Sequence, residues 1–229
     1  MYLQDKRIVV TGAFGTLGTA VVRAALDAGA VVAALDQAPA QKNPPARLHP
    51  VGGLDLTVRD VAGSAIDEAA HVLGGIDALV NIAGTFRWET LADGDVDTWD
   101  LLYRVNLRSA VAMSQASIPH LRAAGGGRIV NIGAGAAARA GAGMGAYAAS
   151  KAGVARLTEA LAEELKDERI TVNAVLPSII DTPPNRADMP KADFDRWVKP
   201  EQLADVILFL LSDRATAITG ALLPVTGRV

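Results

Sequence analysis

The feature that most constrains this chain is a glycine-rich segment placed between a strand and a helix. The strand candidate Arg7–Thr11 leads into Gly12-Ala13-Phe14-Gly15-Thr16-Leu17-Gly18, and a segment of helical period begins at Leu17. Glycines in this setting permit a tight turn, a close approach of backbone to a ligand, and close packing of helix on strand. Free N–H groups at the start of such a helix bind phosphate oxygens. We therefore expect a dinucleotide site in which Gly12, Gly15, Thr16, Leu17 and Gly18 surround the pyrophosphate.

A carboxylate at the end of the next strand candidate indicates which dinucleotide is bound. Ala30–Leu35 runs directly into Asp36, and no Arg or Lys follows until Lys42. A carboxylate about twenty residues after the glycines accepts hydrogen bonds from the ribose hydroxyls of NAD and repels the extra phosphate of NADP. The sequence therefore favours NAD(H) as the cofactor.

A weaker strand candidate, Leu48–Gly52, is followed by Asp55 and Leu56. Side chains at this place could contact the adenine of the same cofactor. An Asp just before a helix is also a common N-cap, so two interpretations of Asp55 stay open.

Short apolar runs alternate with longer segments of helical period along the whole chain. The remaining strand candidates are Ala78–Asn81, Arg128–Ile132, Thr171–Leu176 and Ala221–Val225, and the helix candidates are Leu17–Ala28, Val58–Leu73, Thr98–Ala124, Gly145–Asp167 and Glu201–Leu211. This alternation predicts an α/β fold with a doubly wound parallel sheet of about seven strands and helices on both faces. We interpret residues 1–229 as a single domain. The segment 178–200, with four prolines and little periodicity, is too long for a plain connection and is expected to act as a lid.

Composition excludes several classes of function. The chain has no cysteine, which rules out disulfides, thiolate metal sites and a cysteine nucleophile. Its three histidines are scattered, so no metal is expected. The net charge of −3 argues against a nucleic-acid partner. Met1–Arg7 is short and polar, and no apolar run has the length of a membrane span. We expect a cytoplasmic protein that acts on a small molecule.

Tyr147 and Lys151 are four residues apart in a segment of helical pattern, so their side chains share one face. A neighbouring ammonium favours the phenolate and is expected to lower the pKa of the tyrosine. Such a pair suits general acid–base chemistry at a substrate oxygen or nitrogen. The motif alone is common, and its weight comes from its position after the fifth strand candidate of a dinucleotide fold.

Over nearly its whole length the chain resembles the short-chain dehydrogenase/reductases. The resemblance depends on the glycine turn, Asn81-Ile82-Ala83-Gly84, Asn106, Tyr147–Lys151 and Pro177-Ser178-Ile179-Ile180-Asp181-Thr182. It implies that Tyr147 is the acid/base, that Lys151 holds the nicotinamide ribose and tunes Tyr147, and that Asn106 supports a proton relay near Lys151. It further implies cofactor contacts; their residues are Asn81, Ala83, Gly84, Pro177, Ile180 and Thr182. A homodimer or homotetramer through the helices 98–124 and 145–167 is also implied.

Two positions depart from the pattern of that family. The usual middle glycine of the turn would fall at Thr16, whereas here it is Gly15. The catalytic serine usually stands thirteen residues before the tyrosine, and that position is Ala134, with no serine among its neighbours. Either the chemistry has been lost, or the substrate does not need the hydroxyl.

The second explanation is supported by the quinonoid dihydropteridine reductases, which this chain resembles in having alanine at the serine position. The resemblance extends through the C-terminal third of the chain, including Asp181-Thr182-Pro183, Asn185-Arg186 and Trp197. Ala134, Trp88 and Arg186 are accordingly the candidate substrate residues. Two alternatives remain: an NAD-linked alcohol dehydrogenase or 3-oxoacyl reductase with an altered proton relay, and a dinucleotide-binding sensor with little activity.

Overall fold

The computed structural model describes residues 2–40 and 42–229. Seven parallel strands form one sheet in the order β3-β2-β1-β4-β5-β6-β7. The strands are β1 (Arg7–Thr11), β2 (Val31–Leu35), β3 (Leu48–Val51), β4 (Ala78–Asn81), β5 (Gly127–Ile132), β6 (Ile170–Pro177) and β7 (Leu222–Val225). The expected α/β fold, a doubly wound parallel sheet with helices on both faces, is confirmed, and the strand candidates agree with the observed strands to within one residue at each end.

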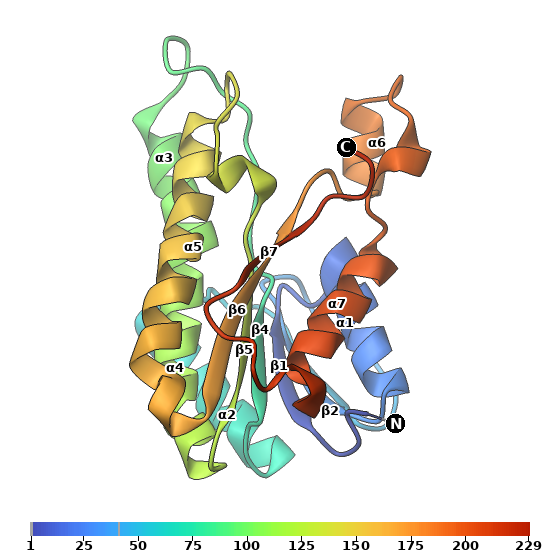
Figure 1. Cartoon of the computed structure of the whole chain (residues 1–229), viewed down its shortest axis with the longest axis vertical. Coiled ribbons are helices and arrows are strands. Elements are labelled where there is room, and N and C mark those ends of the chain that lie inside the picture. Colours follow the sequence, from blue (N-terminus) through green and yellow to red (C-terminus); the bar gives the residue numbers. More distant parts are fainter. Residues whose placement is uncertain (1, 41) are drawn as a thin grey trace.

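The helices lie in two layers on either side of this sheet (Figure 1). They are α1 (Thr16–Asp27), α2 (Arg59–Leu73), α3 (Val96–Leu102), α4 (Ser109–Ala123), α5 (Gly145–Leu165), α6 (Pro183–Asp188) and α7 (Pro200–Leu211), with a π-helical segment at Tyr103–Arg108. Short 3-10 turns occupy Gly135–Ala137, Lys166–Glu168, Phe194–Arg196 and Asp213–Ala215.

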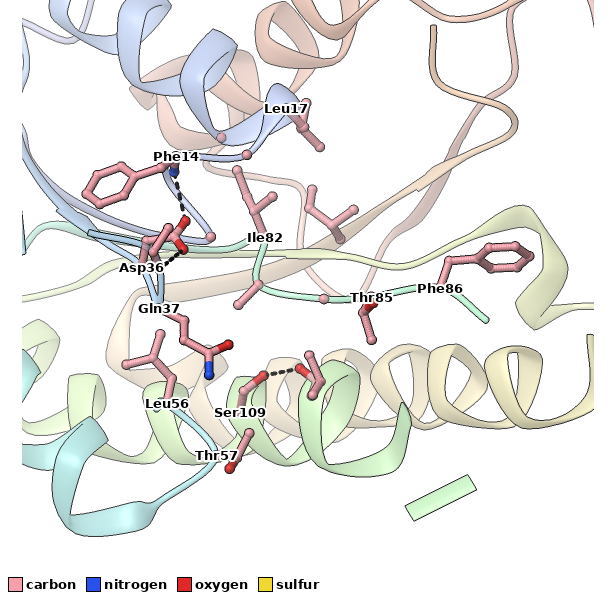
Figure 2. A pocket seen from close by; sticks show the side chains of 18 of the residues that line it. Phe14, Leu17, Asp36, Gln37, Leu56, Thr57, Ile82, Thr85, Phe86 and Ser109 are labelled. Atoms are coloured by element: carbon pink, nitrogen blue, oxygen red, sulfur yellow. Dashed lines mark hydrogen bonds between the residues drawn. The ribbon is translucent and has the colours of Figure 1, made fainter. Parts of the chain in front are cut away.

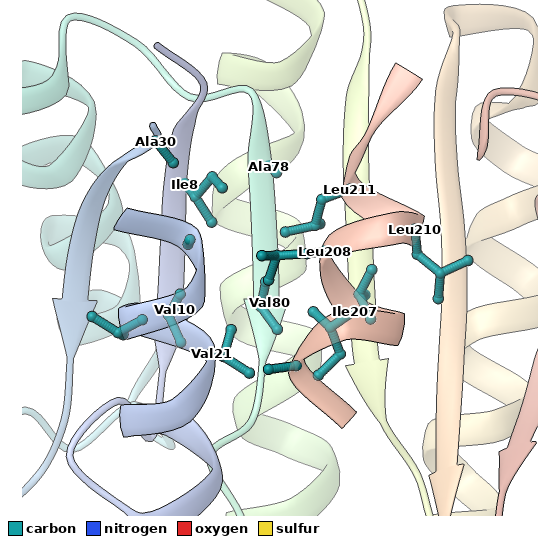
Figure 3. Close-up of a cluster of buried hydrophobic side chains, with 14 of the residues drawn as sticks. Ile8, Val10, Val21, Ala30, Ala78, Val80, Ile207, Leu208, Leu210 and Leu211 are labelled. Atoms are coloured by element: carbon teal, nitrogen blue, oxygen red, sulfur yellow. The ribbon is translucent and has the colours of Figure 1, made fainter. Parts of the chain in front are cut away.

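Alternating side chains of the strands supply two separate cores, as the two-residue period of a strand requires. Ile8 and Val10 pack with α1 and α7 in one cluster (Figure 3). Val9, between them, packs with α2, α4 and α5 in the other. The helices thus bury both faces of the sheet, which is the arrangement expected for parallel strands that read as near-continuous apolar runs.

The strand order reverses between β1 and β4. From β1 the chain proceeds outward to β2 and β3, and β4 then lies on the opposite side of β1. The connections after β1 and β4 therefore diverge and leave a crevice at the carboxyl ends of these strands. In open α/β sheets such a switch point is where ligands bind.

One sequence-based expectation differs from the structure, and one segment contains more regular structure than its lack of periodicity indicates. The single helix expected over 98–124 is divided into α3, the π-helical segment and α4. The segment 178–200 is more ordered than a plain loop, since it contains α6 and a short bridge that pairs Ile180 with Val198. Within the described residues, no helix combines the length and the apolar character needed to cross a membrane.

Candidate active site

A cavity of about 730 Å³ opens at the switch point of the sheet. Its wall brings together segments from the first third of the chain, the middle and the last third. The predicted site residues on this wall are Gly12, Gly15, Thr16, Leu17, Gly18, Asp36, Asp55, Leu56, Ala83, Gly84, Tyr147, Lys151, Ile180 and Thr182. A cavity of this size is within the range of small-molecule and cofactor sites.

The glycine turn packs so closely that there is no space for a side chain at Gly12 or Gly18. Gly12 has a φ of +60°, and a Cβ there would lie 2.8 Å from the backbone nitrogen of Ala83. A Cβ on Gly18 would lie 2.1 Å from the carbonyl oxygen of Gly12. Gly15 occupies the cap position of α1, whose first turn has no acidic residue. The unpaired N–H groups and positive end of α1 at the cavity wall fit the pyrophosphate of a dinucleotide.

Thr11, the last residue of β1, joins this turn to the segment after β4. Its Oγ1 accepts hydrogen bonds from the backbone N–H groups of Ile82 and Ala83, at 3.0 and 3.1 Å. The side chain is buried. Thr11 therefore fixes the spacing between two walls of the cavity, a role that the sequence analysis missed.

Asp36 lies directly beside the glycine turn (Figure 2). One of its carboxylate oxygens accepts a hydrogen bond from the backbone N–H of Phe14 at 2.8 Å, and the other accepts from Ala38 at 2.9 Å. A carboxylate has about four acceptor positions, so both oxygens retain capacity for a ligand hydroxyl. The structure thus places Asp36 on the cavity wall and already orients its carboxylate.

Asp55 is not the N-cap of α2, because Val58 occupies that position. It lies on the cavity wall with Leu56, and its Oδ1 also accepts hydrogen bonds from the hydroxyl and the backbone N–H of Thr57. These bonds from Thr57 hold the pKa of Asp55 below its usual value. Asp55 therefore stays ionised in the turn before α2.

Tyr147 and Lys151 lie on the same face of α5, and both line the cavity. Nζ of Lys151 lies 6.0 Å from the centroid of the Tyr147 ring and donates a hydrogen bond to the carbonyl of Ile132 at 2.7 Å. Burial raises the pKa of Tyr147 to about 12 and lowers the pKa of Lys151 to about 8. The expectation that the ammonium lowers the pKa of Tyr147 is wrong for this structure, because desolvation dominates and the ammonium is bound by Ile132.

Phe86 is a wall residue that the sequence analysis did not identify. Its ring packs edge-on against the ring of Tyr147, with centroids 4.9 Å apart and planes at 84°. Leu101 and Val105, from α3 and the π-helical segment, line the same cavity. The substrate end is therefore largely apolar around the phenol group.

Asn106 lies in the π-helical segment, buried behind the cavity wall. Its Nδ2 donates to the carbonyl of Thr85 and to Oγ of Ser150, and its Oδ1 accepts from the N–H of Thr85 at 2.7 Å. Gly84 separates it from Lys151, since a Cβ on Gly84 would lie 3.0 Å from Oδ1 of Asn106 and 3.5 Å from Nζ of Lys151. Both side-chain N–H groups are thus used in holding the Gly84–Thr85 backbone to α5, and the structure gives this side chain no direct relay contact with Lys151.

Asn81 and Pro177, both expected at the cofactor, are not on the cavity wall. Asn81 is buried beneath it, where its Nδ2 donates to Asn131 at 2.9 Å and to Ser114 at 3.2 Å. Pro177 is the buried last residue of β6. Both residues are buried behind the cavity wall, and their contact with the cofactor stays a prediction.

The three substrate candidates also lie outside the cavity wall. Ala134 is buried just after β5. Trp88 is 61% exposed, and its indole N–H donates to the carbonyl of Ala142 while its ring covers Gly143. Arg186 pairs with Asp181 and stacks over Phe194. Local partners therefore already bind Trp88 and Arg186.

Comparison with known proteins agrees with this geometry. A family model described as "Enoyl-(Acyl carrier protein) reductase" matches residues 12–227. The chain is 32% identical to the 3-oxoacyl-(acyl-carrier-protein) reductase FabG of Thermotoga maritima, over 99% of this chain and 98% of that protein. It is 34% identical to an NAD-dependent glycerol dehydrogenase of Listeria innocua, with 98% and 94% covered.

A solved structure of a short-chain dehydrogenase/reductase from Serratia marcescens superposes with a TM-score of 0.86 at 30% identity, covering 100% of this chain and 99% of that one. The chain belongs to the short-chain dehydrogenase/reductase family. It is therefore an oxidoreductase of a family that uses nicotinamide dinucleotides, NAD or NADP.

Proposed function

We propose that this member of the family transfers a hydride between NAD(H) and a small substrate, with Tyr147 as the general acid/base. The observation that carries the proposal is the meeting of Tyr147 and Lys151 with the glycine turn and Asp36 in one cavity. The dinucleotide, when bound, supplies or accepts the hydride. The chain's own groups bind it, orient the substrate and move the proton.

The preference for NAD(H) over NADP(H) is supported by charge. Asp36 places a carboxylate beside the glycine turn, where the adenosine ribose of the cofactor is expected. Among the described residues of the cavity wall, the Lys and Arg side chains are Lys151, on α5, and Arg104, in the π-helical segment. Neither belongs to the turn or to β2, so nothing local to Asp36 offsets repulsion of a 2′-phosphate.

Burial gives Tyr147 and Lys151 complementary roles. With a pKa raised to about 12, Tyr147 keeps its proton at neutral pH and is ready to donate it to an oxygen or nitrogen of the substrate. Lys151 lies close enough to stabilise the phenolate that remains, provided that its ammonium moves from Ile132. Phe86, against the ring, shields this proton transfer from water.

The substrate is less constrained, and two candidates have separate support. Ala134 lacks the hydroxyl that would polarise a carbonyl, which favours a quinonoid dihydropterin, whose ring nitrogens take the proton. The named activities of the relatives, an oxoacyl reductase and a glycerol dehydrogenase, favour a carbonyl or alcohol. A sensor without activity is disfavoured because a buried, partly desolvated Lys151 costs stability that a scaffold does not need.

Oxidation of NADH with quinonoid dihydropterin and with a panel of ketones and 3-oxoacyl thioesters separates these candidates. We expect turnover with at least one, and a loss of about a hundredfold or more in Tyr147→Phe, with NADH binding by calorimetry unchanged. Equal turnover by Tyr147→Phe would refute the acid/base assignment. NADH binding without turnover on any substrate would support the sensor.

Three further expectations remain proposals. We propose a homodimer or homotetramer through α4 and α5. It is supported by Val111, which is 41% exposed on α4, and it is checked by light scattering of the chain and of Val111→Asp.

We also propose that residues 1–229 act as one domain in the cytoplasm. In that domain the segment 178–200, which supplies Ile180 and Thr182 to the wall, covers the bound cofactor.

A further inference from the structure

A second cavity, of about 450 Å³, lies at the amino ends of the strands, whereas the candidate active site lies at their carboxyl ends. It is formed where β1, β4, β5 and β6 begin and where α7 ends. Ile8, Ala78 and Leu211 line it, and Figure 3 shows these three side chains together at the end of the core cluster where the strands start. Its volume is within the range of small-molecule sites.

Just beneath the floor of this cavity lie polar atoms that the protein leaves unsatisfied. Arg128 on β5 and Thr171 on β6 are register partners in the sheet, and both line the cavity. Nε of Arg128 and Oγ1 of Thr171 are buried and have no hydrogen-bond partner in the described part of the chain. Thr171 is only 7% exposed. Buried polar groups of native proteins nearly always have a partner, so these two indicate a missing ligand or water.

The rim of the cavity is rich in positive charge. Lys6, Lys166 and Arg169 join Arg128 around it, and they come from three segments of the chain, since Lys166 and Arg169 share the connection between α5 and β6. The guanidinium of Arg169 forms no ion pair with any described residue. The backbone carbonyl of Arg169 accepts a hydrogen bond from the N–H of Gly127, the residue before Arg128.

The carboxylates near the cavity neutralise only part of this charge. Asp77, on the wall, is held by the guanidinium of Arg7 through two hydrogen bonds, at 2.9 and 2.7 Å. Asp213 is shared between Lys6, at 3.3 Å, and Arg128, at 3.7 Å. Lys166 pairs with Glu163 on the exposed side of α5. The partial negative charge at the carboxyl ends of α4, α5 and α7 offsets a further part.

The backbone of Arg169, at the amino ends of the strands, has a conformation that is uncommon for a residue other than glycine. Arg169 has a φ of +58°, in the left-handed region, and Gly126 approaches it so closely that a Cβ on Gly126 would lie 2.8 Å from its carbonyl oxygen. Non-glycine residues in this region are infrequent and tend to occur where the surrounding structure has a use for them. This conformation caps the 3-10 turn Lys166–Glu168 and fixes the position of Arg169 at the rim of the cavity.

We propose that the cavity binds the phosphate group of a small anion. A phosphate oxygen accepts from Nε–H of Arg128 and from the hydroxyl of Thr171, and its charge is matched by Arg169 and Lys6. Both floor atoms are shielded in this structure, so the anion reaches them by drawing Arg128 away from its long contact with Asp213. The cavity exceeds the size of a free phosphate, which leaves room for an organic group attached to it.

Calorimetric titration with inorganic phosphate and with a sugar phosphate, at constant ionic strength, tests the proposal. Saturating NADH is present throughout, so that phosphate does not report on the N-terminus of α1. The variants are Thr171→Val, which keeps the shape and removes the hydroxyl, and Arg169→Asn, which tolerates the left-handed backbone. Arg156→Gln, on the exposed face of α5, is the matched control for loss of one positive charge.

We expect saturable binding that each cavity variant weakens by about tenfold and that Arg156→Gln leaves unchanged. Tighter binding of the sugar phosphate assigns the site to a phosphorylated metabolite, and equal binding assigns it to free phosphate. Absence of saturable binding, or binding that neither cavity variant weakens, would overturn the proposal and leave water as the partner of the two floor atoms. Circular dichroism of each variant verifies that a loss of binding is not a loss of fold.

Discussion

The two ends of the active-site cavity are built in different ways. At the dinucleotide end, backbone atoms form the wall, because Gly12 and Gly18 leave no space for a side chain and Asp36 is oriented by backbone N–H groups. At the substrate end, side chains from separate segments form it, with Phe86 against Tyr147 and Lys151 on the carbonyl of Ile132. The first end is therefore encoded locally, whereas the second depends on how distant segments pack.

The largest expected effect comes from adding one methyl group to the dinucleotide end. Gly18→Ala places a Cβ 2.1 Å from the Gly12 carbonyl oxygen, a backbone atom that cannot move aside. We expect a loss of about 3 kcal/mol in the free energy of unfolding, measured in urea, and no detectable binding of NADH.

Gly15→Ala is the matched control for that change. A Cβ on Gly15 lies 3.4 Å from the same oxygen, and the φ of Gly15 is −72°, which any residue adopts. Its free energy of unfolding should change by no more than about 0.5 kcal/mol. If the two variants lose equal stability, the turn is not as tightly constrained as the geometry indicates.

This difference between the two ends also explains how far the sequence could predict the molecule. The strands, most helices and the glycine turn follow from local periodicity and glycine spacing, and these predictions were accurate. The division of residues 98–124 by a π-helical segment leaves no mark in the apolar period. Phe86 could not be identified because its contact with Tyr147 depends on the path of the loop after Gly84. Trp88 and Arg186 are substrate candidates by resemblance alone; local partners bind both, and their contact with the substrate stays a prediction.

The second prediction concerns the cost of burying Lys151 at the substrate end. Its pKa falls from about 10.4 in an unfolded chain to about 8 in the folded one. Between these values the unfolded chain binds more protons, so this group makes stability rise with pH. Lys151→Met removes the cost of burying the ammonium group. We expect this variant to be more stable than the unaltered chain by about 1–3 kcal/mol at pH 7.

The difference in the free energy of unfolding between Lys151→Met and the unaltered chain should shrink progressively as the pH rises from about 8 towards 10. Urea unfolding of both proteins at several pH values measures it, and Lys191→Met, at an exposed position, is the control that should show no such trend. A gap that stays constant over this range would mean that Lys151 titrates normally in the fold.

The third prediction returns to the dinucleotide end. Asp36→Ala removes the carboxylate that repels a 2′-phosphate, and we expect the preference for NAD(H) over NADP(H) to fall by about tenfold or more. Calorimetric titration with both cofactors measures the ratio. Asp36→Asn retains the shape and one acceptor for the N–H groups of Phe14 and Ala38, so a similar change of ratio in that variant attributes the effect to charge. Tighter binding of NADP(H) than NAD(H) by the unaltered chain would contradict the assignment.

The smallest expected effect tests the one position where the substrate end departs from its family. Ala134 is buried at the start of the turn after β5, and it is absent from the cavity wall. Serine differs from alanine by a single oxygen atom, so Ala134→Ser should fold with a change of no more than about 1 kcal/mol. Loss of an oxyanion donor typically lowers a rate by about a hundredfold. The reverse substitution should recover only part of that on simple ketones, because the new hydroxyl must rotate from the buried position towards the cavity.

We therefore expect a gain of several-fold, about tenfold at most, in kcat/KM for ketones, with little change for quinonoid dihydropterin. The measurement is NADH oxidation with both substrates, and the double variant Ala134→Ser, Tyr147→Phe should show no gain, because a polarised carbonyl still needs a proton. A gain that persists without Tyr147 would place the proton donor elsewhere. No gain on any ketone would mean that position 134 does not face the reacting group, and the argument from the missing hydroxyl to a pterin substrate would then lose its basis.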